Sequence, residues 1–299
     1  MTALRISVPA SSANLGPAFD SAGIALNLYL TLEVETQDEW EFIHVSDLLP
    51  TITTYEEHFI YQIAKQTADQ FDLVLPPCKV RVTSDIPLAR GLGSSAAAAL
   101  AGVEIANQLC HLNLSSEAIL KFGTALEGHP DNIAASLMGG LVISTLEEEE
   151  VHYVKLPLSE LEAVISIPSF ELKTEEARNV LPEHYTRKQA ATASSLSNVL
   201  IAALTSGNIK LAGEMMEKDL FHEPYRAGLL PHYEIIKREA KSAGSYGTVI
   251  SGAGPSMISF AQKGAGRSLA RHLQELFPDF QVKVAQIDQE GIQINSKLI

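Results

Sequence analysis

The strongest chemical signal in this chain lies in the segment PLARGLGSSAAAAL, residues 87–100. Two glycines and two serines stand there directly before a run of small helix-forming residues. The backbone N–H groups at a helix N-terminus form a site for an anion such as phosphate. We therefore predict a phosphate-binding loop with contacts from Pro87, Leu88, Ala89, Arg90, Gly91, Leu92, Gly93, Ser94, Ser95, Ala96 and Ala97.

Other interpretations of this loop are weaker. A Walker A loop is excluded because no Lys follows the last glycine. Gly91, Gly93 and Ala96 match a degenerate dinucleotide fingerprint, but residues 86–90 separate them from the preceding strand and no acidic residue stands at the required distance. A glycine-rich helix entry with a purely structural role is the remaining alternative. The pattern favours a nucleoside triphosphate.

Phosphoryl transfer depends on positioning and charge neutralisation more than on covalent chemistry. Mg²⁺, the usual cation for this task, takes one or two carboxylate or hydroxyl ligands and keeps several waters. Glu127, in a loop after an apolar helical pattern, is the candidate carboxylate, and Ser95 is the candidate hydroxyl. A solvated helix end is the alternative interpretation of Glu127.

Four segments of the chain resemble the motifs of the GHMP kinase superfamily. PLARGLGSSAA is similar to its second motif, VPASSANLGPAFDSAGIAL to its first, EGHPDNIAASLMGG to its middle landmark and VISGAGPSMI to its third. All four stand in the family's order along the whole chain. The first has the form found in the homoserine kinases of this superfamily, so the chain is identified as a member.

The resemblance implies ATP as phosphoryl donor and Mg²⁺ as the essential ion. It implies Mg²⁺ coordination by Ser95 and Glu127, and catalytic roles for these two residues and Asn132. The third motif adds Ser251, Gly252 and Gly254 to the ATP contacts. Relatives often carry an Asn that contacts adenosine in the helix predicted over 55–71, where this chain has His58 and Phe59.

An amino acid that carries an alcohol, such as L-homoserine, needs three kinds of partner. Its ammonium group needs a carboxylate, its carboxylate needs an Arg fork, and its alcohol needs a hydrogen-bond partner beside the γ-phosphate. The residue types that recur in homoserine kinases stand at matching positions here, which implies L-homoserine as acceptor, on the pathway to threonine. The expected substrate residues are Asn14 and Asp20 for the ammonium, Thr174, Arg178 and Arg226 for the carboxylate, and His129 and Asn132 near the alcohol.

Several alternatives stay open at the level of sequence. Asp131 acts either as the base, as proposed for the corresponding Asp of mevalonate kinases, or as a residue that orders the pocket, and His129 is either a base or a hydrogen-bonding wall. The rival functions are another GHMP kinase with a different small alcohol, a non-catalytic nucleotide-binding protein of this fold, and a nicotinamide-dependent oxidoreductase.

The elements that must position these residues follow from hydrophobic periodicity. Strands are expected over 4–9, 24–36, 78–87, 139–145, 152–157 and 282–288, with a loop at 10–23, and helices over 55–71, 94–110, 115–128, 186–204 and 266–277. This order predicts an α+β chain with two domains, residues 1–155 and 156–299. The resemblance implies an N-terminal ATP-binding domain like the second domain of ribosomal protein S5 and a ferredoxin-like C-terminal domain, with both substrates in the cleft between them.

Composition narrows the class of protein further. The 299 residues carry 36 acidic against 22 basic side chains, a net charge of −14, which argues against a nucleic-acid or anionic-membrane partner. The two cysteines form no C-x-x-C pair, no signal-peptide pattern opens the chain, and the uncharged runs are shorter than the ~20 residues of a membrane helix. We therefore expect a cytoplasmic protein. Many members of the superfamily are dimers, which leaves a homodimer open.

Overall fold

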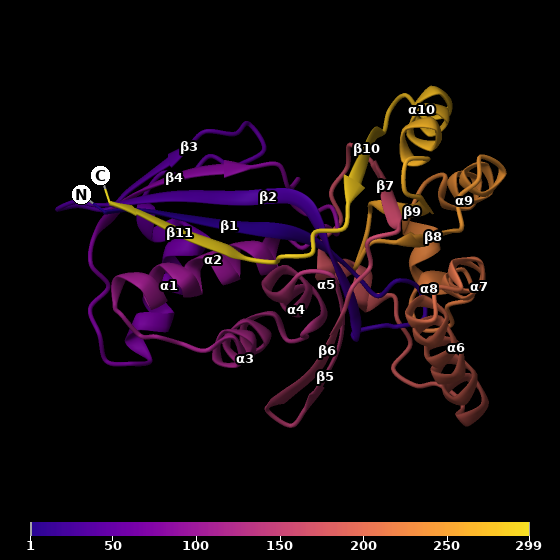
Figure 1. Ribbon diagram of the computed structural model, residues 1–299, viewed down its shortest axis with the longest axis horizontal. Coiled ribbons are helices and arrows are strands. Elements are labelled where there is room, and N and C mark those ends of the chain that lie inside the picture. Colours follow the sequence, from indigo (N-terminus) through magenta and orange to yellow (C-terminus); the bar gives the residue numbers. More distant parts are fainter. Residues whose placement is uncertain (1, 299) are drawn as a thin grey trace.

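Two β-sheets lie side by side in the computed structural model, which describes residues 2–298 (Figure 1). In the first sheet the strands follow the order β11-β1-β2-β4-β3, and β5 and β6 extend it from one end of β2. The second sheet has the order β10-β7-β9-β8. Helices accompany both sheets, so the predicted α+β class is confirmed.

The first sheet is built around the long hairpin of β1 and β2. Leu30, Leu32 and Val34 alternate with more exposed neighbours along β2, as expected for a strand with one buried face. The strands are β1 Thr2–Ala13, β2 Ala22–Thr36, β3 Glu41–His44, β4 Cys78–Ser84, β5 Leu141–Glu147, β6 Glu150–Leu156 and β11 Gln293–Leu298.

The loop expected over residues 10–23 is shorter than predicted. After a register shift between Pro9 and Ala10, β1 continues to Ala13 and pairs with the start of β2. The small residues of this stretch, which looked like loop residues, are buried under the helices. The connecting loop is therefore residues 14–21, and the strand brings it to the boundary between the two sheets.

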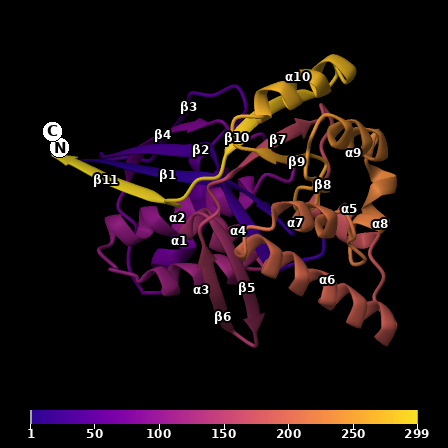
Figure 2. The same ribbon diagram turned by 45° about the vertical axis from the view of Figure 1, so that its right-hand side comes forward.

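Four helices cover one face of the first sheet, as Figures 1 and 2 both show. Helix α2 is buried over most of its surface, and its small residues permit close packing: a Cβ at Gly102 would lie 2.7 Å from the Cβ of Ile63 in α1. The helices are α1 Phe59–Asp69, α2 Ser94–Leu109, α3 Ser116–Glu127 and α4 Asp131–Met138, and a 3-10 turn, η1, spans Tyr55–Glu57.

The second sheet has the strand order and the β-α-β-β-α-β sequence of the expected ferredoxin-like arrangement. All its neighbouring strands are antiparallel, and β7 is buried along its whole length as a central strand. Its strands are β7 Leu161–Ile167, β8 Gly247–Ile250, β9 Met257–Gln262 and β10 Gln281–Gln286. Its helices are α5 Thr174–Asn179, α6 Arg187–Thr205, α7 Ile209–Met216, α8 Glu223–Arg226, the 3-10 turn η2 Ala227–Leu229, α9 Tyr233–Ser242 and α10 Gly266–Leu276.

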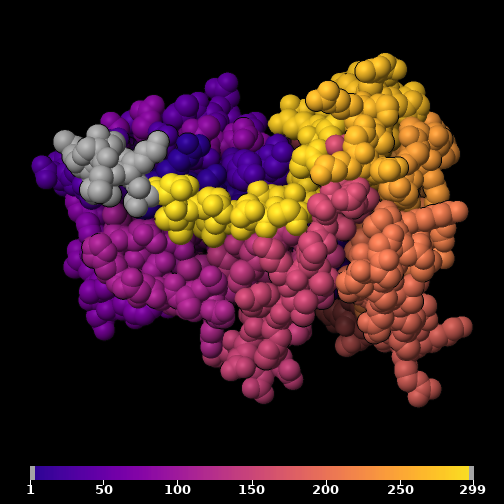
Figure 3. All heavy atoms as spheres, viewed as in Figure 1, coloured from indigo at the N-terminus to yellow at the C-terminus, as the bar shows by residue number. Residues whose placement is uncertain are grey.

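The last strand returns to the first sheet. β11 pairs antiparallel with β1, so both ends of the described chain lie at the same end of the molecule, and Figure 3 shows this strand along the surface of the first sheet. The predicted division at residue 155 had assigned all later residues to the second domain. A six-residue strand with no strong pattern of its own could not be placed from sequence.

One hydrophobic core joins the two sheets. The residues of β7 alternate between two clusters: Ala163 and Ile165 pack into the large core of the first sheet, whereas Val164 faces α9 and α10 on the other side. The two sheets therefore meet through packed side chains. Among the described residues 2–298, every helix is too short or too polar to span a lipid bilayer.

Candidate active site

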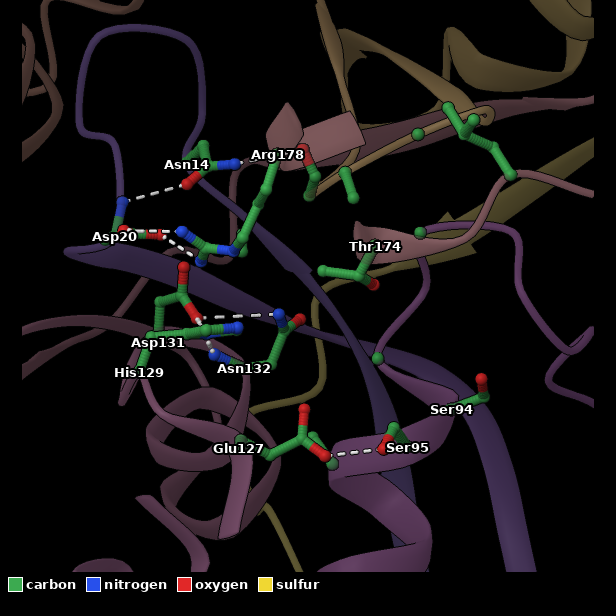
Figure 4. Close-up of a pocket in the computed structure, with 18 of the residues that line it drawn as sticks. Asn14, Asp20, Ser94, Ser95, Glu127, His129, Asp131, Asn132, Thr174 and Arg178 are labelled. Atoms are coloured by element: carbon green, nitrogen blue, oxygen red, sulfur yellow. Dashed lines mark hydrogen bonds and ion pairs between the residues drawn. The ribbon is translucent and has the colours of Figure 1, made fainter. Parts of the chain in front are cut away.

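A cavity of about 300 Å³ opens where the two sheets meet. Its walls come from the loop at 14–20, the glycine loop before α2, the segment 127–132, the start of α5, Arg226 of α8 and the loop at 252–254. Figure 4 shows polar side chains from these segments around one space, with Asp20 and Arg178 at one end and Ser95 and Glu127 at the other. Most of the residues predicted from distant motifs are therefore brought together.

The glycine loop before α2 packs closely against β1 and the loop at 252–254. Gly91 and Gly93 both have positive φ values, 72° and 67°, which favour glycine. A Cβ at Gly91 would lie 2.2 Å from the Ser251 carbonyl oxygen, and one at Gly93 would lie 2.2 Å from Ser11 Oγ. The glycines thus allow this loop to contact both β1 and the loop at 252–254, and Ser94 then starts α2.

Ser95 and Glu127 meet at the other end of the cavity. Ser95 lies in the first turn of α2 and Glu127 is the last residue of α3, and Ser95 Oγ donates a hydrogen bond of 2.5 Å to Glu127 Oε1. A hydroxyl and a carboxylate in contact beside a helix N-terminus are the hard oxygen donors that Mg²⁺ prefers. The donor set therefore fits the predicted cation.

The start of α4 holds three polar residues in fixed positions. Asp131 is buried, and its Oδ1 accepts hydrogen bonds of 2.7 Å from His129 Nδ1 and from the backbone N–H of Asn132. Burial disfavours the charged imidazolium of His129, but the hydrogen bond and the charge of Asp131 outweigh it and raise its pKa. Asp131 thus orders both neighbours.

Asp20 and Arg178 form a two-pronged ion pair, with distances of 2.9 and 3.2 Å between guanidinium nitrogens and carboxylate oxygens. Asn14 holds the Asp20 side of this pair in position through hydrogen bonds. Its Oδ1 accepts from the Asp20 N–H and its Nδ2 donates to the Gly252 carbonyl oxygen, both at 3.0 Å. Asn14 thus connects the loop at 14–21 with the loop at 252–254, and this connection fixes the position of Asp20 at the wall of the cavity.

Arg226 is buried at the wall of the cavity, with 1% of its surface exposed. Its Nε donates to the Ala177 carbonyl oxygen at 3.0 Å, and its Nη1 donates to the Gly252 carbonyl oxygen at 3.0 Å and to His222 Nδ1 at 3.1 Å. Burial, with the charge of Arg178 acting in the same direction, lowers the pKa of Arg226 to about 10. The guanidinium is therefore still charged at neutral pH.

Phe19 is a site residue that sequence reasoning missed. The Cζ atoms of Arg178 and Arg226 lie 5.7 and 5.4 Å from the centroid of its ring, which lines the cavity. Contacts of this kind are worth about 0.5–2 kcal/mol each. The ring therefore holds two like charges near each other, and its position beside Asp20 was the only available signal. Lys173, which also lines the cavity, was missed as well.

Some predicted phosphate-loop residues face elsewhere. The Arg90 guanidinium donates to the carbonyl oxygens of Pro168 and Ser169, and Ser251 Oγ donates to the Gly91 carbonyl oxygen at 2.5 Å. These contacts give Arg90 and Ser251 structural roles. Arg90, Ser251, Pro87, Leu92 and Ala97 do not line this cavity or the neighbouring apolar cavity described below. The remaining predicted ATP-binding residues line one or both of these cavities: Leu88, Ala89, Gly91, Gly93, Ser94, Ser95, Ala96, Gly252 and Gly254. Thr174, at the start of α5, lines the main cavity.

A second cavity of about 310 Å³ shares Ala89, Ser94 and Ser95 with the first. Its walls are mostly apolar side chains of β2, β4, α1 and the loop at 49–52. His58 caps α1, since its Nδ1 accepts from the Ile60 N–H, and its Nε2 lies 2.9 Å from Nε2 of His44. Burial and the neighbouring His44 lower the pKa of His58 to about 4, so His58 is neutral at physiological pH. The predicted motifs did not reveal this cavity.

Glu223 ties α8 to the second sheet behind Arg226. It is buried, and its carboxylate accepts hydrogen bonds from the Tyr233 hydroxyl at 2.6 Å and from the Ile250 N–H at 2.7 Å. Burial raises the pKa of Glu223 to about 8, although both hydrogen bonds oppose the shift. The folded chain therefore holds this proton at pH values where the unfolded chain has lost it.

Stability should fall as pH rises between about 4.5 and 8, because the folded state binds more protons than the unfolded state in that window. Glu223→Gln keeps the shape of the side chain without the buried charge. We expect its free energy of unfolding to exceed that of the natural protein at pH 8, by on the order of 2–4 kcal/mol, and to differ little at pH 5. Urea denaturation at both pH values measures this. Glu148→Gln, at an exposed turn, is the control, and identical pH profiles for the Glu223 variant and the natural protein would contradict the assignment.

Comparisons with known proteins agree with the predicted family. The model of the GHMP kinase N-terminal domain matches residues 58–140, and that of the C-terminal domain matches residues 200–279. The chain is 50% identical over 296 residues to a homoserine kinase of Oceanobacillus iheyensis, covering 98% of this chain and 99% of that protein. The crystal structure of a homoserine kinase from Cytophaga hutchinsonii superimposes with a TM-score of 0.84 at 27% identity, over 98% of this chain and 97% of the other.

A mevalonate kinase from Methanococcus jannaschii shares the fold, with a TM-score of 0.72 and 18% identity over 95% of this chain and 98% of the other. Identity at this level carries the fold alone. Together the family models and the superpositions confirm the two-part fold that the four motifs predicted. They exclude the alternative of a nicotinamide-dependent oxidoreductase.

Proposed function

Because this chain belongs to the GHMP kinase family and, within it, to the homoserine kinases, we propose that it phosphorylates L-homoserine with ATP in the main cavity. The activity is ATP-dependent phosphorylation of the side-chain hydroxyl, which yields O-phospho-L-homoserine for threonine biosynthesis. The observation that carries the assignment of the site is the presence of one carboxylate and two guanidinium groups at one end of the cavity: Asp20 pairs with Arg178, and Arg178 and Arg226 both lie near the Phe19 ring.

This charge pattern complements an amino acid. The substrate carboxylate lies between Arg178 and Arg226, and the substrate ammonium takes the place of Arg178 as partner of Asp20. The ligand thus exchanges one ion pair for three charge-assisted contacts. Thr174 adds a hydroxyl beside the carboxylate, and Asn14 keeps Asp20 in place.

ATP approaches from the second cavity. Its apolar walls suit an adenine ring, with His58 and Phe59 at the position where relatives carry an Asn. Since Ser94 and Ser95 line both cavities, a nucleotide bound there directs its phosphates over the glycine loop towards the amino-acid end. The N-terminus of α2 and the exposed Lys173 supply positive charge to the phosphates.

Ser95 and Glu127 hold the Mg²⁺ that accompanies ATP. The ion, when bound, neutralises charge on the β- and γ-phosphates. Asn132 and His129 lie between the two ends of the cavity, next to the position of the reacting alcohol (Figure 4). A bond forms between the homoserine hydroxyl oxygen and the γ-phosphorus, and the bond from phosphorus to the ADP oxygen breaks.

The alcohol proton passes to the transferred phosphoryl group as the loose transition state develops. Asp131 is an ordering residue in this scheme, because its Oδ1 already accepts from His129 and from Asn132. His129 donates to Asp131 through Nδ1, which leaves Nε2 as the ring nitrogen for a hydrogen bond to the alcohol.

ADP release with Mg²⁺ and ATP tests the proposed acceptor. The panel contains L-homoserine, D-homoserine, L-serine, mevalonate, galactose and no acceptor. We expect strong turnover with L-homoserine only. Turnover with mevalonate or galactose would retain the kinase and overturn the role of the two arginines, and ATP binding without any turnover would indicate a non-catalytic nucleotide-binding protein.

Glu127→Gln should lower kcat while homoserine binding is largely retained. The amide is a weaker ligand than the carboxylate, so we expect a loss of about 30-fold at 1 mM Mg²⁺, roughly 2 kcal/mol, that decreases as Mg²⁺ is raised. Initial rates over a Mg²⁺ series measure it. Glu117→Gln, in the first turn of α3, is the matched control. A kcat loss that is the same at every Mg²⁺ concentration would argue against a metal ligand.

A further inference from the structure

Behind Asn132 lies a buried serine of the first motif. Ser11, on β1, is fully buried, and its Oγ lies 3.0 Å from Asn132 Oδ1 and 3.2 Å from the Asn132 carbonyl oxygen. Ser136, one turn further along α4, donates its hydroxyl to Ser11 Oγ at 2.9 Å. The backbone N–H of Ser11 donates to the Leu92 carbonyl oxygen, so Ser11 also contacts the glycine loop.

This chain of hydroxyls has a direction. Since Ser136 donates to Ser11, the single hydroxyl proton of Ser11 is directed at Asn132, and the Asn132 carbonyl oxygen Oδ1 receives it. The other end of the same amide, Nδ2, lies 3.5 Å from Asp131 Oδ1, on the acceptor side. Both contacts require the same orientation of an amide that could otherwise rotate by 180°.

We infer that Ser11 is a positioning residue for the phosphoryl transfer: its hydroxyl holds the Asn132 amide so that the N–H donors, and not the carbonyl oxygen, face the reacting oxygens. The inference rests on the proposed function, in which Asn132 contacts the alcohol or the γ-phosphate. A donor held in place stabilises the charge on the phosphoryl oxygens without reorganisation during the reaction. The rotated amide would direct a carbonyl oxygen at those oxygens and repel them.

Gly93 covers the same contact. A Cβ at this position would lie 2.2 Å from Ser11 Oγ and 3.1 Å from Asn132 Oδ1. The phosphate loop therefore packs directly on the hydrogen bond between Ser11 and Asn132 and leaves no room for another side chain there. Through this contact the position of the loop and the orientation of the Asn132 amide depend on one another.

A double-mutant cycle tests the inference, with Ser11→Ala, Asn132→Ala and the double variant assayed at saturating ATP and L-homoserine. We expect Ser11→Ala to lower kcat by about tenfold, since a misplaced catalytic donor has a large effect, with both KM values changed by less than about threefold. In the Asn132→Ala background the same substitution should have no further effect on kcat. Ser166→Ala, on β7, is the matched control, because it removes an equally buried hydroxyl that makes no hydrogen bond to Ser11 or Asn132.

Independent losses of kcat in the two single variants, which multiply in the double variant, would show that Ser11 acts through another residue and would overturn the inference. So would an unchanged kcat in Ser11→Ala. Full activity of Asn132→Ala would instead contradict the proposed role of Asn132, which separates the two failures. Circular dichroism and thermal melting verify that each variant is folded.

An NMR measurement on the Asn132 side chain tests the inference without an assay of turnover, so it does not depend on the identity of the acceptor. The side-chain ¹⁵N–¹H₂ signal of Asn132, assigned by its loss in Asn132→Ala, reports the environment of the amide. We expect one sharp pair of signals in the natural protein and in Ser166→Ala, and a shifted or exchange-broadened pair in Ser11→Ala. An unchanged pair in Ser11→Ala would overturn the inference.

Discussion

Gly93→Val is expected to abolish ATP binding and turnover together. Valine at this position meets two penalties: Gly93 has a φ of 67°, in the left-handed region that β-branched residues avoid, and the Cβ would lie 2.2 Å from Ser11 Oγ. The backbone strain costs about 1–3 kcal/mol by itself. The clash must be relieved by movement of the loop away from β1, and such a movement displaces the N-terminus of α2 and the amide of Asn132.

Isothermal titration calorimetry measures the loss of ATP binding, and a coupled ADP assay measures the loss of turnover. We expect kcat/KM to fall by more than about 1000-fold, since several transition-state contacts are removed at once. Gly207→Val is a matched control for strain. Gly207 has a φ of 74°, it lies beyond the end of α6, and a Cβ there would meet no atom within 4 Å. Normal ATP affinity in a folded Gly93 variant would contradict the phosphate-loop assignment.

Arg226→Ala should act at the opposite end of the cavity. Loss of a buried charge that pairs with the substrate carboxylate typically costs 2–5 kcal/mol, so we expect kcat/KM for L-homoserine to fall by roughly 10²–10³, mainly through KM, with KM for ATP nearly unchanged. Arg226→Lys should restore little, because a single ammonium cannot replace the hydrogen bonds that the guanidinium makes to two backbone carbonyls and the carboxylate.

Substrate truncation separates carboxylate binding from the structural contacts of Arg226. 3-Amino-1-propanol lacks the carboxylate and should be a poor substrate of the natural protein. The Arg226→Ala variant should prefer L-homoserine over 3-amino-1-propanol by a smaller factor than the natural protein, because Arg178 is then the one guanidinium left for the carboxylate. A variant that still prefers L-homoserine by the original factor would show that Arg226 does not bind the carboxylate. Arg238→Ala, at an exposed position on α9, is the control for loss of an arginine.

The sequence predicted the contacts at one end of the cavity more completely than those at the other end. Ser95 and Glu127 came from local motifs with one chemical purpose, and the structure brings them within 2.5 Å of each other. Asp20 and Arg178 were predicted to meet the ligand separately, and in the structure they also bind each other. Arg90 was expected at the phosphates, but its guanidinium donates hydrogen bonds to backbone carbonyl oxygens of the turn that follows β7.

Apart from Lys173, the site residues that the sequence analysis missed have side chains that do not by themselves indicate chemistry. In the sequence, Phe19 looks like any apolar residue in a loop, and Ser11 looks like any small residue in the same loop. Their roles arise from contacts across long distances in the chain: Ser11 and Asn132 are 121 positions apart, and Asn14 and Gly252 are 238 positions apart. Such pairs depend on strand register and sheet packing, which no local pattern encodes.

The sequence by itself determined the family and the class of reaction through its four motifs, and it predicted most of the polar residues that line the main cavity, because each motif has specific residue types at a fixed spacing. Only the tertiary structure decided which atoms face the cavity. Each polar side chain has several possible partners, and the packing of the two sheets selects among them. That is why Asn14 braces two loops, Ser251 turns inwards to Gly91, and Ser11 reaches the amide of Asn132.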